Sequence, residues 1–135
     1  MIQIARDTRV CLESIFPSLD DICKMTCPRC PDACCLSASP WYDWRDLVFL
    51  HLSRLPIPPS QTISGFKQTC CYISHRGCTL PRITRPWICT WYLCPAQTAN
   101  LKDRSAGHWQ ALGRVFGEIK ALRKKLENEF IQLII

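Results

Sequence analysis

The C-terminal part of the chain carries the most regular pattern of apolar and polar positions. Apolar side chains recur there at steps of three and four residues, which is the spacing of one face of an α-helix. The pattern predicts an amphipathic helix over about 105–133, with an apolar stripe made of Trp109, Leu112, Phe116, Ile119, Leu122, Leu126, Phe130 and Leu133. We assign the basic run Arg123-Lys124-Lys125, which lies between stripe positions, to the solvated face.

The N-terminal segment shows a weaker helical spacing. A first helix is predicted over 2–16, where apolar residues fall near one face and Pro17 ends the pattern. Ser18 is placed to cap a separate short helical turn over 19–25.

A further helix is predicted in the middle of the chain, over 40–55. Ser39 fits its N-cap, and Pro40 fits the first helical position, where the missing N–H is no loss. Its apolar face would consist of Trp44, Leu47, Val48, His51 and Leu55.

The remaining segments lack long periodic patterns. Residues 56–69 are typical of a surface loop, and residues 70–95 predict irregular structure with one short hairpin around His75-Arg76-Gly77. A chain of 135 residues with 47% hydrophobic residues suits one globular domain. We therefore expect a mainly α, small single domain over 1–135, with a long C-terminal helix and irregular loops that carry cysteines.

The cysteines change this picture, because the chain contains 11 of them. Most fall in two windows, one over 27–35 and the other over 70–94. Cysteines this dense indicate either a disulfide framework or a metal site. The odd count and the charged N-terminal residues Arg6, Asp7 and Arg9, which do not suit a signal peptide, favour reduced thiols in the cytoplasm. The sequence therefore predicts a cysteine-thiolate metal centre within residues 23–95.

The spacing suggests which thiols bind. Cys27 and Cys30 form a Cys-x-x-Cys turn that can direct two sulfurs at one ion. Cys34 and Cys35 are adjacent, so both can reach that ion only through a sharp turn. In the alternative, one of them binds that ion and the other binds a second ion or packs in the core. Cys70 is an alternative to Cys71. The expected ligands are Cys27, Cys30, Cys34, Cys35, Cys71, Cys78, Cys89 and Cys94.

Zinc is the preferred ion, and iron or an iron–sulfur cluster is the alternative, because thiolates bind both. We expect Cys11 in the core and leave Cys23 unassigned, with His75 as the nearest histidine alternative. The spacing of Cys23, Cys27 and Cys30 looks like a radical-SAM cluster motif, but the barrel of such enzymes needs about 200 residues.

The net charge of +6 counts thiols as neutral. Two zinc ions held by eight thiolates would lower it to about +2. We therefore interpret the basic excess of residues 36–102 first as compensation for thiolates, with Arg85 as the expected partner of the buried sulfur charge. Nucleic-acid binding is not favoured, because the aromatic residues are more often core and site packing.

Several short motifs follow one another in a recognisable order. They are Cys27-x-x-Cys30-x-x-x-Cys34-Cys35, then Gly77-Cys78, then Thr84-Arg85-Pro86-Trp87-Ile88-Cys89. This order resembles the CxxCxxCC-type (YkgJ-like) family of zinc- or iron-chelating domains over about residues 23–95. The resemblance implies bound zinc or iron without one settled activity, and similar domains in enzymes that methylate flagellin lysines leave a catalytic role open.

We therefore expect a metal-binding protein. An iron–sulfur redox protein or enzyme component, for example one related to methyl transfer, is one alternative, and a zinc-stabilised nucleic-acid or protein interaction module is another. No phosphate loop, nucleophile triad or carboxylate pair indicates a catalytic residue. The expected partners are the metal ion and, through the C-terminal helix, a second copy or another protein, and no membrane span is expected.

Overall fold

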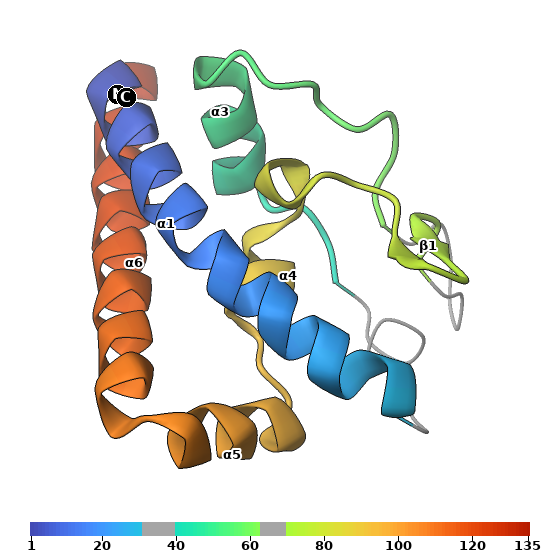
Figure 1. The fold of residues 1–135 in the computed structure, drawn as a ribbon. Helices are drawn as coiled ribbons and strands as arrows, with labels where there is room; N and C mark the ends of the chain where they lie inside the picture. Colours follow the sequence, from blue (N-terminus) through green and yellow to red (C-terminus); the bar gives the residue numbers. More distant parts are fainter. Residues whose placement is uncertain (31–39, 63–69) are drawn as a thin grey trace.

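The structure is a computed structural model that describes residues 1–30, 40–62 and 70–135. Its α-helices are α1 (Ile2–Thr26), α3 (Trp44–Leu52), α4 (Trp87–Trp91), α5 (Pro95–Arg104) and α6 (Ala106–Ile134), as Figure 1 shows. Two 3₁₀ turns, η1 (Cys27–Arg29) and η2 (Arg82–Thr84), and a hairpin of β1 (Ile73–Ser74) and β2 (Gly77–Cys78) complete the described elements. The expected mainly α class is confirmed.

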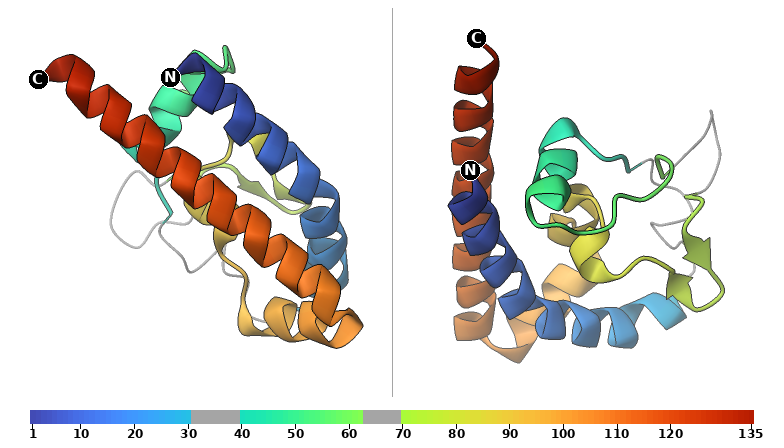
Figure 2. Two further views of the ribbon diagram at one scale, coloured as in Figure 1. Left: turned by 90° about the vertical axis from the view of Figure 1, so that its left-hand side faces the viewer. Right: turned by 90° about the horizontal axis from the view of Figure 1, so that it is seen from above.

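The long helices α1 and α6 pack against each other in opposite directions, so both termini lie at the same end of the molecule (Figures 1 and 2). The N-terminal amine of Met1 pairs with Oε2 of Glu129 at 2.8 Å, which ties the start of α1 to the end of α6. Their facing sides form most of the core, to which Tyr42, Phe49, Leu50 and Leu101 also contribute. Helix α1 supplies Ile4, Ala5, Leu12, Ile15, Leu19 and Ile22, and α6 supplies Leu112, Ile119 and Leu126.

The prediction that Pro17 ends the first helix is wrong, because α1 continues through Pro17 to Thr26. A proline removes one helical hydrogen bond and its ring crowds the preceding turn, and α1 accordingly bends part-way along (Figure 1). Burial of Leu19 and Ile22 beyond the proline supplies favourable energy that offsets the lost bond. The separate turn expected over 19–25 is therefore part of the same helix.

The helix predicted over 40–55 is shorter, since α3 begins at Trp44. Asp43 is its N-cap and forms a capping box with Asp46, so that Oδ1 of Asp43 accepts from the backbone N–H of Asp46 at 3.0 Å. Pro40 is buried outside the helix, and Ser39, the expected cap, lies outside the described residues.

The apolar face expected for this helix is only partly right, although Val48 and Leu55 do pack against the core. Its buried residues are Asp46, Phe49 and Leu50, whereas Trp44 and Leu47 are 40% and 37% exposed. Asp46 points inward because it forms a buried ion pair with Arg123 of α6.

The predicted hairpin is confirmed, with Ile73 opposite Cys78 and Ser74 opposite Gly77. Gly77 adopts φ +103°, which side-chain-bearing residues rarely reach, and Oγ of Ser74 donates to the carbonyl of Gly77 at 2.8 Å. The loop expected over 56–69 contains neither helix nor strand over 56–62, and its remainder falls outside the described residues. The expectation for 70–95 missed α4, and no helix was predicted where α5 forms.

The long C-terminal helix is confirmed as α6, and Oγ of Ser105 caps it by accepting from the N–H of His108 at 3.2 Å. The stripe residues Leu112, Ile119 and Leu126 are buried, but Leu133 at the end of the stripe is 69% exposed. The expected dimer or partner contact through this helix stays a prediction.

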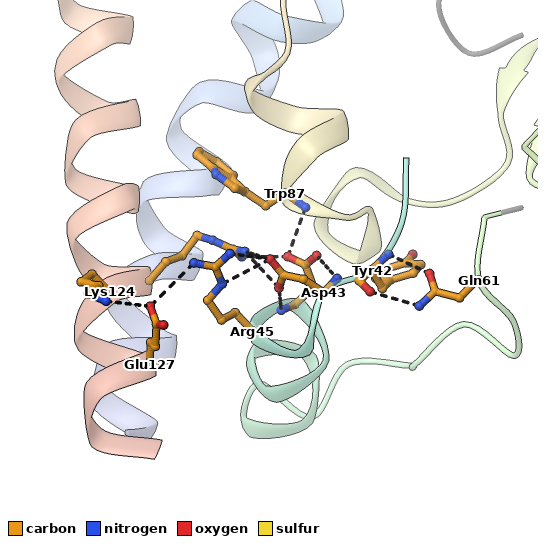
Figure 3. A network of polar contacts seen from close by, with 9 residues as sticks. Tyr42, Asp43, Arg45, Gln61, Trp87, Lys124 and Glu127 are labelled. Atoms are coloured by element: carbon orange, nitrogen blue, oxygen red, sulfur yellow. Dashed lines mark hydrogen bonds and ion pairs between the residues drawn. The ribbon is translucent and has the colours of Figure 1, made fainter. Parts of the chain in front are cut away.

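One residue of α6 contradicts the predicted pattern. Arg123, assigned from the sequence to the solvated face, is only 8% exposed. Its guanidinium bonds the carboxylates of Asp46 on α3 and of Asp43, the N-cap of that helix, and lies 5.7 Å from the ring centre of Trp87. Figure 3 shows the polar contacts around Asp43 and Trp87. The same carboxylate oxygen of Asp46 accepts from the backbone N–H of Trp87 at 3.2 Å, so that one buried polar cluster joins α3, α4 and α6.

The two carboxylates of this cluster differ in their ease of protonation. Burial raises the pKa of Asp46 above its ordinary value, although Arg123 acts in the opposite direction. Asp43 is less enclosed. Burial raises its pKa too, but the hydrogen bond from the Asp46 backbone and the charges of Arg45 and Arg123 together lower it below its ordinary value.

Candidate metal centre

The Cys-x-x-Cys segment forms a tight turn directly after α1. The 3₁₀ turn η1 covers Cys27–Arg29, and the backbone N–H of Cys30 donates to the carbonyl of Cys27 at 3.1 Å. Pro28 suits this turn, since its fixed φ is helical and its missing N–H is not needed at the start of a turn. Both Cys27 and Cys30 are exposed. The turn therefore presents two exposed cysteines, and Cys34 and Cys35 follow it in the sequence.

A second pair of cysteines consists of Cys23, in the last turn of α1, and Cys27, the C-cap residue of that helix. Residues four apart lie on the same side of a helix, one turn from each other. Nε2 of Gln97, on α5, is 3.7 Å from Sγ of Cys23 and 3.6 Å from Sγ of Cys27. It also donates to Oγ1 of Thr26 at 3.2 Å. One side-chain amide thus faces two cysteine sulfurs.

The orientation of Gln97 is set by a third cysteine. Cys94 is the N-cap of α5, and its sulfur accepts from the backbone N–H of Gln97. In return, Oε1 of Gln97 accepts from the backbone N–H of Cys94 at 3.3 Å. Because a backbone N–H can only donate, the amide oxygen belongs on that side and the amide nitrogen faces α1. Gln97 itself is 7% exposed, so this arrangement is buried.

Arg82 approaches the same site from η2. Its Nη2 is 3.3 Å from Sγ of Cys23, and its Nε bonds the carboxylate of Asp20, one turn earlier on α1. Burial lowers the pKa of Arg82, but the hydrogen bonds to Asp20 and Cys23 outweigh this effect and raise its pKa above the ordinary value. The guanidinium is therefore a fixed positive charge beside the Cys23 sulfur.

The arginine expected from the sequence to compensate thiolate charge was Arg85, three positions later. Nε of Arg85 donates to the carbonyl of Leu80 at 3.0 Å, and its side chain is half-buried. Arg82, by contrast, has its Nη2 within 3.3 Å of the Cys23 sulfur. The role of Arg85 stays a prediction. Arg82 and Arg85 are three positions apart, and their spacing from the cysteines gives no reason to prefer Arg82 as the partner of a sulfur.

Cys78 and Cys89 lie in a second region, near the hydroxyl of Tyr42. Tyr42 is 5% exposed and donates to the carbonyl of Thr84 at 2.5 Å. Burial raises the pKa of Tyr42, and the nearby Tyr72, Cys89 and Cys78 raise it further. Strand β2 therefore brings Cys78, and helix α4 brings Cys89, within electrostatic range of one buried phenol.

The other cysteines are spread around these two regions. Sγ of Cys71 donates to the carbonyl of Gln61 at 3.3 Å and lies 3.7 Å from Oγ of Ser60. The backbone carbonyl of Cys70 accepts from the N–H of Ile73 at 3.2 Å. Cys11 packs against the core, as expected, with its sulfur 3.7 Å from Oε2 of Glu118. Burial and the charge of Glu118 raise the pKa of Cys11, which keeps this thiol protonated.

The eight expected ligands are thus only partly placed. Cys34 and Cys35 lie outside the described residues, and within 1–30, 40–62 and 70–135 no three potential ligands converge on one point. No disulfide joins any two of the described cysteines. The sequence did not assign Cys23, Arg82 or Gln97. The one sequence signal for Cys23 is its spacing of four from Cys27, and nothing in the sequence singles out Gln97.

Comparison with protein-family models, with curated proteins and with solved structures finds no match to this chain. The family resemblance described above therefore stays an expectation. In the described part of the chain, no helix combines the length and the apolar character needed to cross a lipid bilayer.

Proposed function

We propose that this protein binds a metal ion through cysteine thiolates, with zinc as the preferred ion and iron or an iron–sulfur cluster as the alternative. The observation that carries the proposal is the turn at Cys27–Arg29. Its backbone hydrogen bond from Cys30 to Cys27 brings these two exposed cysteines into one tight turn at the end of α1. Structural zinc sites use such paired cysteines, because a tetrahedral ion needs several soft ligands in a small volume.

The remaining ligands of the proposal come from the two cysteine windows. Cys34 and Cys35 follow the turn within a few residues, which makes them the nearest candidates to complete a four-sulfur site. Cys71, Cys78, Cys89 and Cys94 are the candidates from the second window. A second ion is proposed for this window, because eight thiolates exceed the four that one tetrahedral ion takes. Such thiolates persist in a reducing compartment such as the cytoplasm.

The arginines support the proposal through charge. A metal site with four thiolates and one divalent ion carries a net charge of about −2, which is costly to bury without nearby cations and hydrogen-bond donors. Arg82 already supplies one guanidinium to a sulfur of this region, and we propose Arg85 as a second cation for the same purpose. An activity that uses the metal is not part of the proposal.

Elemental analysis of the protein purified without oxygen tests the proposal, together with its visible spectrum. One or two zinc ions per chain and no visible absorption are expected, since zinc is colourless and redox-inactive. A brown protein with absorption near 400 nm, as iron–sulfur clusters show, would replace zinc by the alternative. Protein free of metal after anaerobic purification and zinc addition, or disulfides between the two cysteine windows, would contradict it.

A further inference from the structure

We propose that Cys23 is a ligand of the same metal centre, paired with Cys27 on one side of α1, and that Gln97 and Arg82 hold its thiolate in place. This inference rests on the proposed metal-binding function and gives Cys23 one of the four positions on that ion, in place of one of the adjacent pair Cys34 and Cys35. It also places part of the metal centre on α1 and α5, two helices that the hydrophobic core holds in position.

The distances around Gln97 carry the first step. Its Nε2 lies 3.7 Å from the Cys23 sulfur and 3.6 Å from the Cys27 sulfur. Two sulfurs bound to one tetrahedral zinc ion, with Zn–S bonds of about 2.3 Å, lie about 3.8 Å from each other. Both sulfurs lie within 3.7 Å of one amide nitrogen and belong to residues one helical turn apart, so rotation of the two side chains can bring them to this separation. The pair thus forms half of a tetrahedral site.

The same pair is poorly placed for a disulfide. Cβ atoms four residues apart on a helix are about 5–6 Å from each other, whereas a disulfide needs about 3.5–4.5 Å. Bridging Cys23 and Cys27 would distort the last turns of α1, where Leu19 and Ile22 are buried in the core. A metal ion spans this separation without such distortion.

The donors around Cys23 carry the second step. The amide of Gln97 and the guanidinium of Arg82 both donate to its sulfur, from two different elements. A thiol sulfur is a weak acceptor, whereas a thiolate accepts such hydrogen bonds strongly. The side chain of Arg82 is 11% exposed, so its charge is largely removed from water at this point. Both donors suit a metal-bound thiolate, whose orientation usually depends on hydrogen bonds of this kind.

Cys11, on the same helix, shows the opposite arrangement. Its sulfur faces the carboxylate of Glu118, which accepts and cannot donate. The partner of Cys11 is an acceptor that would repel a metal-bound thiolate, whereas the two partners of Cys23 are donors that would stabilise one. Cys11 and Cys23 are both half-buried cysteines of α1, so the contrast lies in their neighbours and not in their exposure.

The experiment compares Cys23→Ala with the matched control Cys11→Ala, using Zn²⁺ affinity and the Co²⁺-substituted protein. Near-ultraviolet absorption from sulfur-to-cobalt charge transfer scales with the number of Co–S bonds. We expect Cys23→Ala to lose intensity equal to one bond and at least tenfold in zinc affinity, and Cys11→Ala to match the wild type. Gln97→Ala should keep the full absorption but weaken zinc binding about 10- to 100-fold.

Alkylation of the wild-type protein gives a test that no folding defect can obscure. Zinc should protect Cys23 and Cys27 from a thiol reagent, measured residue by residue by mass spectrometry, beyond any change at Cys11. Equal protection at Cys11 would point to folding alone and overturn the inference. If Cys27→Ala weakens zinc binding while Cys23→Ala does not, and Cys23 stays reactive with zinc, the inference fails and the proposed function stands. If the wild type binds neither ion, both fail.

Discussion

Arg123 and Asp46 lie 77 positions apart in the sequence, and Nη1 of Arg123 is 2.7 Å from Oδ1 of Asp46 in the core. Their side chains are 10% and 7% exposed, so water solvates neither group well. The pair joins the middle of α6 to the first turn of α3, and the backbone of Trp87 attaches α4 to the same carboxylate. Loss of this ion pair should therefore lower the free energy of unfolding of the whole domain.

Arg123→Met tests this pair. The variant leaves the Asp46 carboxylate buried without its cation, which typically costs about 3–5 kcal/mol in the free energy of unfolding. Denaturation by urea, followed by circular dichroism, measures the loss. Lys124→Met, on the next and exposed position, is the control and should stay within about 0.5 kcal/mol of the wild type. A loss below about 1 kcal/mol for Arg123→Met would mean that the carboxylate is solvated after all.

Tyr42 predicts a loss of stability at alkaline pH. Its pKa is raised in the folded state above the unfolded value of about 10, mainly by burial. Its contribution is therefore complete below pH 10 and falls as the pH rises above that value, because the unfolded chain releases the phenol proton while the folded state keeps it for the hydrogen bond to Thr84.

The difference between the wild type and Tyr42→Phe isolates this effect from other alkaline titrations. At pH 7 the variant should be less stable by about 1–3 kcal/mol, since the carbonyl of Thr84 loses its donor in a buried place. Between pH 9 and 11 the gap in unfolding free energy should narrow. A gap that stays constant over this range would show that the hydroxyl does not titrate with an elevated pKa.

The N-cap of α6 gives a prediction on local structure. Oγ of Ser105 accepts from the N–H of His108, so Ser105→Ala should lower the free energy of unfolding by about 1 kcal/mol. Ser105→Asp keeps an acceptor at the cap and adds a negative charge at the positive end of the helix dipole. It should match or exceed the wild type in thermal denaturation. Equal losses in both variants would argue against the cap.

Metal removal should act on the fold itself if the proposed centre is structural. Structural zinc contributes about 10–16 kcal/mol of apparent binding free energy in small peptides, which is comparable to the total stability of a domain. A strong chelator is therefore expected to abolish cooperative unfolding, and added zinc should restore it. Identical melting curves with and without chelator would show that the core of α1 and α6 folds without the ion.

The helical class could be predicted because it depends on local pattern. The stripe of α6 repeats over many turns, and Leu112, Ile119 and Leu126 are buried as that repeat requires. The hairpin could be predicted because Gly77 supplies the positive φ of its turn. Both signals are contained in neighbouring residues, so that no knowledge of distant contacts is needed.

Where the predictions were wrong, a distant partner overrode the local pattern. Pro17 is a strong local stop, but the packing of Leu19 and Ile22 carries α1 beyond it. The start of α3 is the exception, because there a second local signal, the capping box of Asp43 with Asp46, overrides the proline at position 40. The ends of these helices were therefore hard to predict from proline positions alone.

In the candidate metal centre, too, some features follow from the local sequence and others only from the tertiary structure. From the sequence alone come the number of cysteines, the Cys-x-x-Cys turn and the preference for metal over disulfides, since these follow from residue type and spacing. Only the tertiary structure brings Gln97 of α5 and Arg82 of η2 to the sulfur of Cys23, and Arg123 to Asp46. Such pairs form because burial forces each charge or donor to find a partner, and that partner can lie anywhere along the chain.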